Sequence, residues 1–293
     1  MTTPSRVAAV TGGSGYLGSR ICQTLESRGW QVIRLTGSAA QAPGQVVKYE
    51  LTAPVTAQVS EALRSADVLI HAAYSFTQKT ADEIWRVNVA GTRRLLEAAK
   101  EATTGRVIVV SSMSAFPGTT QLYGKAKIDI EDMTVKFGGC AIRPGLVYGK
   151  EAGGMAGSLR KLSGLPAVPM ITGGAGVYTV AEGDLMEAVA LLAAAPALEP
   201  GVISLAHPGK VTLADLVSTF AAQENRTPRF FPVPWRLVLL GLKTGELLRL
   251  PMPFRSDSLL GLVYPGTGPV GEDRLIPLGI KFQAFKSEPK GQL

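Results

Sequence analysis

The sequence predicts a doubly wound α/β fold, in which helices cover both faces of a parallel sheet. Short apolar runs alternate with segments of helical periodicity through the first half of the chain. These runs are nearly continuous in apolar character, as expected for strands that are buried on both faces. A glycine-rich turn at 12–18 joins the first run to the first helix. Together these observations indicate a Rossmann-like sheet with a smaller C-terminal lobe.

The predicted elements follow one another in regular order. Strands are expected at 6–10, 31–35, 67–71, 106–110, 139–143 and 202–206. Helices are expected at 16–28, 59–65, 83–99, around Tyr123, and at 183–195. This alternation is typical of crossover connections between parallel strands.

The composition is that of a globular protein with a basic surface. Hydrophobic residues make up 46% of the 293 residues, and the formal net charge is +7. A positive charge favours anionic partners, such as a phosphorylated small molecule, or serves solubility alone. Nucleic acid is not expected, because no run of Lys and Arg with interleaved aromatic residues is present.

Cysteine and histidine usage narrows the class further. Cys22 and Cys140 lie in apolar surroundings without metal-ligand spacing, which favours buried thiols in a reducing cytoplasm. With only two histidines, no metal site is expected. No secretory signal is expected, and the apolar segments 187–198 and 234–250 are too short, or too interrupted by charge, to span a membrane. The second segment could instead lie on a membrane or a partner as an amphipathic helix.

The turn after the first predicted strand has the spacing of a phosphate-binding loop. Gly12 allows a tight turn after Thr11, Gly15 lets the backbone approach a pyrophosphate, and Gly18 lets helix and strand pack closely. The helix that begins near Tyr16 adds unpaired N–H groups and a partial positive charge. A glycine-rich surface turn is the alternative, which the position at the first strand–helix junction disfavours. We therefore expect a dinucleotide cofactor.

The second strand bears on the choice of cofactor. It ends without the carboxylate that usually meets an unphosphorylated ribose. Arg34, or Arg20, could hold a 2′-phosphate together with the hydroxyls of Thr36 and Ser38. Alternatively, Arg34 is an ordinary solvated strand residue. The sequence favours NADP over NAD on this argument.

A second motif suggests proton transfer. Tyr123 and Lys127 are four residues apart on a predicted helix, so they share a face. A neighbouring ammonium is expected to lower the pKa of the phenol. Ser111 and Ser112 follow the strand at 106–110, at the edge of the sheet where ligands bind. A hydroxyl there can orient a carbonyl or alcohol toward the tyrosine, although a local strand-end turn would also explain either serine.

Six short motifs occur in one order along the first half of the chain. They are Thr11-Gly-Gly-Ser-Gly-Tyr-Leu-Gly18, Asp67-Val-Leu-Ile-His-Ala-Ala73, Asn88-Val-Ala-Gly-Thr92, Val110-Ser-Ser112, Tyr123-x-x-x-Lys127 and Arg143-Pro-Gly-Leu-Val-Tyr-Gly149. In sequence and order they resemble the extended short-chain dehydrogenase/reductase family, also called the NAD(P)-dependent epimerase/dehydratase family. The remainder of the chain resembles the family only in general style.

The resemblance implies a role for particular residues. Tyr123 would be the general acid/base, Lys127 its electrostatic partner and ribose ligand, and Ser112 the hydroxyl that orients substrate, with Ser111 and Ser114 as weaker matches. Asn88 would brace the strand–helix geometry beside the site. The cofactor contacts expected from the motifs and the resemblance together are Thr11, Gly12, Gly15, Tyr16, Leu17, Gly18, Arg34, Thr36, Glu50, Leu51, Ala72, Ala73, Asn88, Tyr123, Lys127, Pro144 and Val147.

The domain organisation follows from a change of character after Gly149. Residues 1–149 are predicted to form the dinucleotide-binding Rossmann domain, with 178–206 returning to it. Residues 150–177 and 207–293 are predicted to form the substrate-binding lobe. Within this lobe, residues 153–176 are rich in Gly and Pro and are expected to be loop-like.

The active-site motif departs from that of the family's sugar-nucleotide dehydratases. These enzymes carry Thr-Asp-Glu where this chain has Ser112-Met113-Ser114, and a methionine cannot transfer protons. Dehydration is therefore disfavoured. The gap between Ser112 and Tyr123 is also shorter than in many epimerases, which suggests a trimmed loop over the pocket.

Three functions stay open. The first is an NAD(P)-dependent oxidoreductase or epimerase acting on a sugar nucleotide or related sugar, which the resemblance and the positive charge favour. The second is a reductase or dehydrogenase of a small apolar alcohol or ketone, steroid-like or phenolic, with the apolar segment 235–250 as a pocket wall. The third is a non-catalytic NAD(P)-binding sensor or assembly protein, since a fold alone does not establish function. A homodimer is one option for the assembly.

Overall fold

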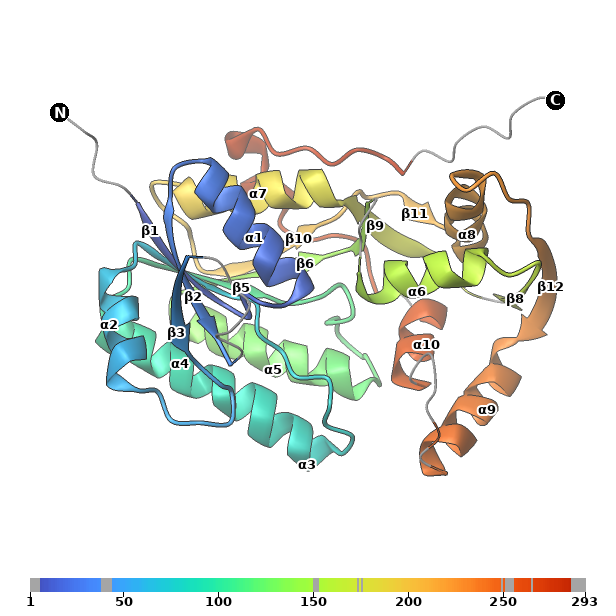
Figure 1. Ribbon diagram of the computed structural model, residues 1–293, viewed down its shortest axis with the longest axis horizontal. Coiled ribbons are helices and arrows are strands. Elements are labelled where there is room, and N and C mark those ends of the chain that lie inside the picture. The colour runs from blue at the N-terminus through green and yellow to red at the C-terminus, as the bar shows by residue number, and fades with distance from the viewer. Residues whose placement is uncertain are drawn as a thin grey trace.

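The central element of the structure is a seven-stranded parallel sheet in the order β10-β6-β5-β4-β1-β2-β3 (Figure 1). The computed structural model describes residues 6–37, 44–149, 153–172, 174, 176–248, 250, 256–264 and 266–285. The strands are β1 (Val7–Thr11), β2 (Gln31–Thr36), β3 (Gln45–Lys48), β4 (Val68–His71), β5 (Arg106–Val110), β6 (Cys140–Pro144) and β10 (Gly201–Leu205). The doubly wound parallel sheet predicted from the sequence is confirmed.

The strand order places a switch point beside β1. From β1 the chain winds outward through β2 and β3 on one side, and through β4, β5, β6 and β10 on the other. Thr11 at the end of β1 is paired with Leu35 of β2 and with His71 of β4, so these strand ends are level with one another. In open α/β sheets, ligands bind at this carboxyl edge beside the switch point.

Helices cover both faces of the sheet (Figure 1). One face carries α1 (Tyr16–Ser27) and α7 (Glu182–Ala194), and the other carries α2 (Ala57–Ser65), α4 (Ala90–Glu101) and α5 (Leu122–Lys136). Successive side chains of strand β4 point to opposite faces of the sheet and pack in two different hydrophobic clusters. Ile70 packs with the cluster that contains Leu25 of α1, whereas its neighbour Leu69 packs with Leu63 and Leu95 on the other side.

Two details on this domain differ from the sequence-based expectation. The single helix expected at 83–99 is three segments: α3 (Ala81–Ile84), a π-helical stretch η2 (Trp85–Val89), and α4. A capping box between Thr80 and Glu83 sets the start of α3. Strand β3 had no prediction at all, because four residues at a sheet edge give too little periodicity to stand out.

The rest of the chain forms a lobe beyond the carboxyl ends of the strands. It contains a three-stranded sheet of β7 (Leu146–Tyr148), β9 (Val177–Ala181) and β11 (Lys210–Val211), and a parallel pair of β8 (Ala167–Thr172) and β12 (Arg229–Pro234). Its helices are α6 (Gly154–Ser163), α8 (Leu213–Ala222), α9 (Trp235–Leu247) and α10 (Ser256–Val263). Short 3₁₀ turns, η3 (Glu272–Arg274) and η4 (Ile276–Leu278), return the chain to the edge of the main sheet beside β10.

The expectation of a loop at 153–176 is wrong, since this stretch contains α6 and β8. The glycines obscured a helical apolar face. Ala156 and Leu159 of α6 are buried with Val168 of β8 and Phe220 of α8 in a separate small core. Among the helices in the described residues, none combines the length and the apolar character needed to cross a membrane.

Candidate active site

In the glycine turn after β1, backbone segments approach one another closely. Gly12 has φ of +69°, and a Cβ placed on it would lie 3.0 Å from the backbone of Ala73. A Cβ on Gly18 would lie only 2.1 Å from the carbonyl oxygen of Gly12. Side chains are therefore excluded at both positions, and the backbone is left open to an approaching ligand.

The N-terminus of α1 fits the pyrophosphate of a dinucleotide. Gly15 occupies the N-cap position, so no side chain caps the first turn, and that turn contains no acidic residue. Its N–H groups and the helix dipole are available to an anion. Tyr16 and Leu17 follow, and both line the adjoining cavity. The open glycine turn and this uncapped helix thus match the cofactor expected from the sequence.

Thr11 anchors the loop that follows β4. Its hydroxyl accepts hydrogen bonds from the backbone N–H groups of Ala72 (3.1 Å) and Ala73 (3.2 Å). Its single proton is therefore directed to Nδ1 of His71, 2.7 Å away. The Nε2–H of His71 then points to the hydroxyl of Thr92 at 2.9 Å. Burial lowers the pKa of His71 to about 3, with Lys127 adding to the effect, so the ring is neutral in the folded protein at ordinary pH.

Asn88 continues this network from the π-helical stretch. Its side-chain oxygen accepts from the N–H of Ser75 (2.7 Å), and its amide donates to the carbonyl of Ser75 (3.1 Å). The hydroxyl of Thr92 donates to the Asn88 backbone carbonyl. Asn88 therefore holds the backbone at Ser75, in the loop after β4 that lines the cavity.

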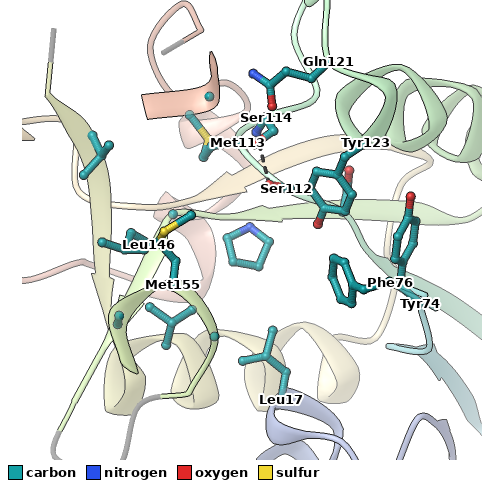
Figure 2. Close-up of a pocket in the computed structure, with 18 of the residues that line it drawn as sticks. Leu17, Tyr74, Phe76, Ser112, Met113, Ser114, Gln121, Tyr123, Leu146 and Met155 are labelled. Atoms are coloured by element: carbon teal, nitrogen blue, oxygen red, sulfur yellow. Dashed lines mark hydrogen bonds between the residues drawn. The ribbon is translucent and has the colours of Figure 1, made fainter. Parts of the chain in front are cut away.

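Tyr123 and Ser112 meet at the back of the cavity (Figure 2). They share a hydrogen bond, and Ser112 Oγ also accepts from the N–H of Ser114 at 3.1 Å. Tyr123 stands in the first turn of α5, and Ser112 follows β5. Burial raises the pKa of Tyr123 to about 12; the Ser112 hydrogen bond opposes this rise, and the charge of Glu131 adds to it.

Lys127 lies one turn further along α5, and its ammonium is buried. Nζ donates to the carbonyl of Val110 at 2.7 Å and lies 4.6 Å from the ring centroid of Tyr74 and 5.9 Å from that of Tyr123. Burial lowers the pKa of Lys127 to about 7, against the opposing charge of Glu131. The sequence-based expectation of a lowered phenol pKa is therefore corrected: burial and the charge of Glu131 outweigh the Ser112 hydrogen bond, and Tyr123 keeps its proton at neutral pH.

The structure separates the roles of the two adjacent serines. The hydroxyl of Ser111 donates to Glu131, whose carboxylate is buried and pairs with Arg143 through contacts of 2.8 and 2.6 Å. Ser112, in contrast, is bonded to Tyr123. The sequence analysis did not single out Glu131, although it lies on the Tyr123–Lys127 face of α5, four residues beyond Lys127.

The two arginines considered for the 2′-phosphate are both paired with carboxylates. Arg34 is 2% exposed, and its guanidinium contacts both carboxylate oxygens of Glu26 at 2.6 and 2.8 Å. Arg20 pairs with Glu182 at 3.2 Å. Both arginines are therefore held in ion pairs. The alternative of Arg34 as a solvated strand residue is wrong, and its contact with the cofactor stays a prediction.

Three other expected cofactor positions, Thr36, Glu50 and Leu51, lie along the edge near β2 and β3. The hydroxyl of Thr36 lies 2.7 Å from that of Ser14, at the glycine turn. The Glu50 carboxylate lies beside Gly37, just past the end of β2, and 3.5 Å from Lys48 Nζ. The carbonyl of Leu51 accepts from Arg94 at 2.6 Å. Ser38 is outside the described residues.

Tyr16 connects the glycine turn to the lobe. Its hydroxyl donates to the carboxylate of Glu182, the first residue of α7. Burial raises the pKa of Tyr16, and the hydrogen bond to Glu182 raises it further. The ring also packs against Gly153, where the lobe begins. Tyr16 therefore keeps its proton at neutral pH, and its side chain forms one side of the cavity.

The cavity has a volume of about 520 Å³ and an apolar wall (Figure 2). Its polar groups are hydroxyls and amides, and among the described residues that line it none is Asp, Glu, Lys, Arg or His. The larger lining side chains are Tyr16, Leu17, Tyr74, Phe76, Ile84, Met113, Phe116, Tyr123, Leu146, Met155 and Tyr178. Leu17 from α1 and Tyr123 from α5 face the same space, as do Pro144 and Val147.

Two aromatic rings lie beside the ring of Tyr123. The ring centroids of Tyr74 and Phe76 are 5.1 and 5.7 Å from that of Tyr123, and 4.9 Å from one another. Phe76 is 66% exposed, on the loop between β4 and α3. The sequence analysis named neither ring, because aromatic residues in a loop form no motif.

The glycine turn, the strand-end serine and the Tyr–Lys helix define a class: a dinucleotide-binding protein of the short-chain dehydrogenase/reductase type. The chain belongs to the NAD dependent epimerase/dehydratase family, whose sequence profile matches residues 8–162. The resemblance inferred from the six motifs is confirmed.

Relatives with assigned activities match over part of the chain. The chain is 29% identical to the ceramide reductase of Caulobacter vibrioides over 181 residues, which cover 59% of this chain and 56% of that protein. It is 36% identical to the 4-hydroxy-2-methyl-3-oxo-4-farnesyl-3,4-dihydroquinoline-1-oxide ketoreductase of Stigmatella aurantiaca over 110 residues, which cover 35% and 32% of the two chains. The matched part of the chain thus spans about half the length of the ceramide reductase and about a third of the length of the ketoreductase.

Solved structures share the fold over a longer stretch. The structure of MoeE5 in complex with UDP-glucuronic acid and NAD superposes with a TM-score of 0.71 over 95% of this chain and 94% of that chain, at 20% identity. At this level of identity, the likeness shows a shared fold and does not extend to the substrate.

Proposed function

We propose that this protein is an NAD(P)H-dependent reductase of an apolar ketone, acting reversibly on the corresponding secondary alcohol. The observation that carries the proposal is that no charged side chain occurs among the described residues that line the cavity around Tyr123 and Ser112. Burying an apolar substrate there is favourable at roughly 25 cal/mol per Å² of apolar surface. The carbonyl oxygen of such a substrate can accept hydrogen bonds from the hydroxyls of Tyr123 and Ser112.

The lining argues against the nucleotide sugar that the sequence analysis favoured. A diphosphate carries charge that must be matched by cations or N–H donors when it leaves water. Arg20, Arg34 and Arg143 are each paired with a carboxylate. These three arginines therefore give no specific support to a nucleotide substrate. The two partial relatives, named as a ceramide reductase and a farnesyl-bearing ketoreductase, agree with an apolar substrate.

The cofactor site is proposed at the glycine turn and the N-terminus of α1, with Pro144 and Val147 beside the nicotinamide. The bound nicotinamide supplies the hydride for reduction and accepts it for oxidation. Because neither arginine is free, the case for NADP weakens, and Glu50 beside the end of β2 offers a carboxylate to a ribose hydroxyl. We therefore expect NADH to bind at least as tightly as NADPH.

The proton chemistry belongs to Tyr123. With its pKa raised, the phenol enters the reaction protonated and can give its proton to the carbonyl oxygen as the carbonyl carbon is reduced. Ser112 shares a hydrogen bond with Tyr123 and can hold the same oxygen. Lys127, whose Nζ lies near the ring, stabilises the phenolate that remains. For alcohol oxidation the proton moves in the opposite direction.

The lobe is proposed to define the substrate. Met155 of α6 and Gly261 of α10 line the cavity together with Ser112, so segments from both parts of the predicted lobe reach the reacting groups. Phe76 covers the opposite side. Differences in these side chains would change which apolar ketone fits.

A substrate panel tests the proposal. Apolar ketones, including steroid-like and long-chain compounds, and UDP-sugars are each mixed with protein and NADH or NADPH. The reduced-nicotinamide absorbance is followed, and the products are separated by chromatography. We expect loss of absorbance with an apolar ketone and none with UDP-sugars. Conversion of a UDP-sugar by the wild-type protein, with every apolar ketone inert, would overturn the proposal.

A further inference from the structure

Helix α9 exposes large apolar side chains on its outer face. Leu237, Leu240 and Leu248, which follows its last residue, are 61%, 65% and 63% exposed. The inner face of the helix is also apolar: Leu242 is buried with Leu259 and Val263 of α10, and Val238 and Leu239 pack against this cluster. A helix at a water-exposed surface normally presents charged and polar residues on its outer side. Leucines on both sides indicate that the outer face has an apolar partner.

The charges on this segment are arranged for an anionic partner. Arg236 and Lys243 are exposed beside the leucines, and Arg229 is exposed at the start of β12, which leads directly into α9. The acidic residue of the segment 229–248 is Glu246. Its carboxylate oxygens accept from the N–H (2.8 Å) and hydroxyl (2.7 Å) of Ser256 on α10, so it is turned inward. The outward charge of this segment is therefore positive.

The location of α9 leaves this face open. Figure 1 shows α9 at the outer edge of the lobe, far from the seven-stranded sheet, with α10 on its inner side. Within the described residues α9 packs on α10, β8 and β12. Helix α10 also carries Gly261, which lines the active-site cavity. The exposed leucines and the cavity are thus joined through one helix pair.

We infer that the α9 surface, defined as Leu237, Leu240, Leu248, Arg236 and Lys243, binds the surface of an anionic lipid bilayer. The helix would lie in the plane of the interface, with the leucines at the acyl boundary and the two cations among the headgroups. Phe231 of β12, 46% exposed just before α9, adds a further apolar side chain. This inference goes beyond the proposed function and does not depend on it.

A second copy of the chain is a poorer occupant for this surface. A two-fold interface through α9 would bring the same patch of both copies together. Arg236 and Lys243 of the two copies would then face like charges at the contact, without an outward carboxylate on the segment to balance them. An anionic bilayer matches the apolar and the cationic parts of the surface together.

The test is co-sedimentation of the full chain with vesicles. One set consists of phosphatidylcholine alone, and the other contains about one third phosphatidylglycerol. We expect binding to the anionic vesicles that weakens with added salt, and little binding to the neutral ones. Exchange of two of the three exposed leucines in Leu237→Gln/Leu240→Gln, and charge reversal in Arg236→Glu/Lys243→Glu, should each weaken binding at least tenfold. Each cation near an anionic surface contributes about fivefold.

A matched control comes from the other end of the lobe. Ile276 in η4 is 74% exposed, so Ile276→Gln removes an equally exposed aliphatic side chain outside the α9 surface. This variant should bind vesicles like the wild type, and circular dichroism should be the same for all variants. Absence of wild-type binding to anionic vesicles, or equal binding by the leucine variant, contradicts the inference. So does a wild-type dimer in light scattering that Leu237→Gln/Leu240→Gln converts to monomer, because the face would then be covered by a second copy.

Discussion

The hydroxyl groups of Ser112 and Tyr123 share a hydrogen bond at the wall of a cavity whose described lining residues carry no charged side chain. Ser112 follows a central strand of the sheet, and Tyr123 stands in the first turn of the helix that comes next, so the turn between them brings the two groups together. Burial keeps the phenol protonated, which suits it to donate a proton to a carbonyl oxygen.

Replacement of Tyr123 by phenylalanine should remove the proton donor while keeping the aromatic packing with Tyr74 and Phe76. We expect the reduction rate to fall by about 10²–10⁴-fold. Binding of NADH, followed by fluorescence titration, should change little. A variant that keeps near wild-type turnover would show that the proton comes from another group.

The two serines provide a paired comparison. Ser112→Ala removes the hydroxyl bonded to Tyr123 and should lower kcat by about 10²-fold at little cost in stability. Ser111→Ala instead leaves the buried Glu131–Arg143 pair without one donor, so it should lower the free energy of unfolding by about 1–2 kcal/mol. Urea unfolding and steady-state kinetics on both variants separate the roles. A loss of turnover in Ser111→Ala and a loss of stability in Ser112→Ala would contradict these two roles.

Arg34→Ala tests whether this arginine belongs to the cofactor site or to the core. Its guanidinium pairs with Glu26 and lies beneath Gly13. We expect a loss of about 2 kcal/mol in unfolding free energy. The affinities for NADH and NADPH should change by the same factor. A selective loss of NADPH affinity would restore Arg34 as a 2′-phosphate ligand.

Phe76 tests the apolar cover of the cavity. Phe76→Ala removes an exposed ring that stands beside Tyr123, and should raise KM for an apolar ketone about tenfold, with a smaller effect on kcat. The matched control is Phe231→Ala, an exposed phenylalanine on β12 outside the cavity lining, which should leave both constants unchanged. Equal effects from the two variants would argue against a substrate contact at Phe76.

His71 makes stability depend on pH. Its pKa is about 3 when folded against about 6.5 for the free side chain, so the unfolded chain binds the proton first as pH falls. This contribution to stability is present above about pH 6.5 and is lost as the pH falls toward 3. Between about pH 7.5 and 5 the loss should be about 2 kcal/mol, and it should be absent from His71→Asn. Urea unfolding at the two pH values measures it, and equal pH dependence in both proteins would contradict the assignment.

Much of the fold was predictable because its signals are local. Apolar strands, the glycine turn and the helix faces are set by residues close together in sequence, as β1, Gly12–Gly18 and α5 show. The four-residue edge strand β3 and the π-helical stretch around Asn88 were not predictable, since neither changes the periodicity of the sequence enough.

The site was predictable in part for the same reason. Tyr123, Lys127 and Ser112 lie in motifs whose positions on strand and helix fix where they meet. The pairing of Arg34 with Glu26 and the burial that raises the pKa of Tyr123 depend on tertiary packing, which no spacing encodes. The described wall of the cavity combines loops with residues of α1, α5, α6 and α10, which are far apart in sequence.

The most direct measurement follows the hydride itself. Reduced cofactor carrying deuterium at the transferring position is incubated with the protein and an apolar ketone, or with a UDP-sugar, and the products are analysed by mass spectrometry. We expect one deuterium on the carbinol carbon of the apolar alcohol. This product should be lost in Tyr123→Phe, and the UDP-sugar should be unchanged. An epimerised UDP-sugar without net consumption of cofactor, and no labelled alcohol, would contradict it.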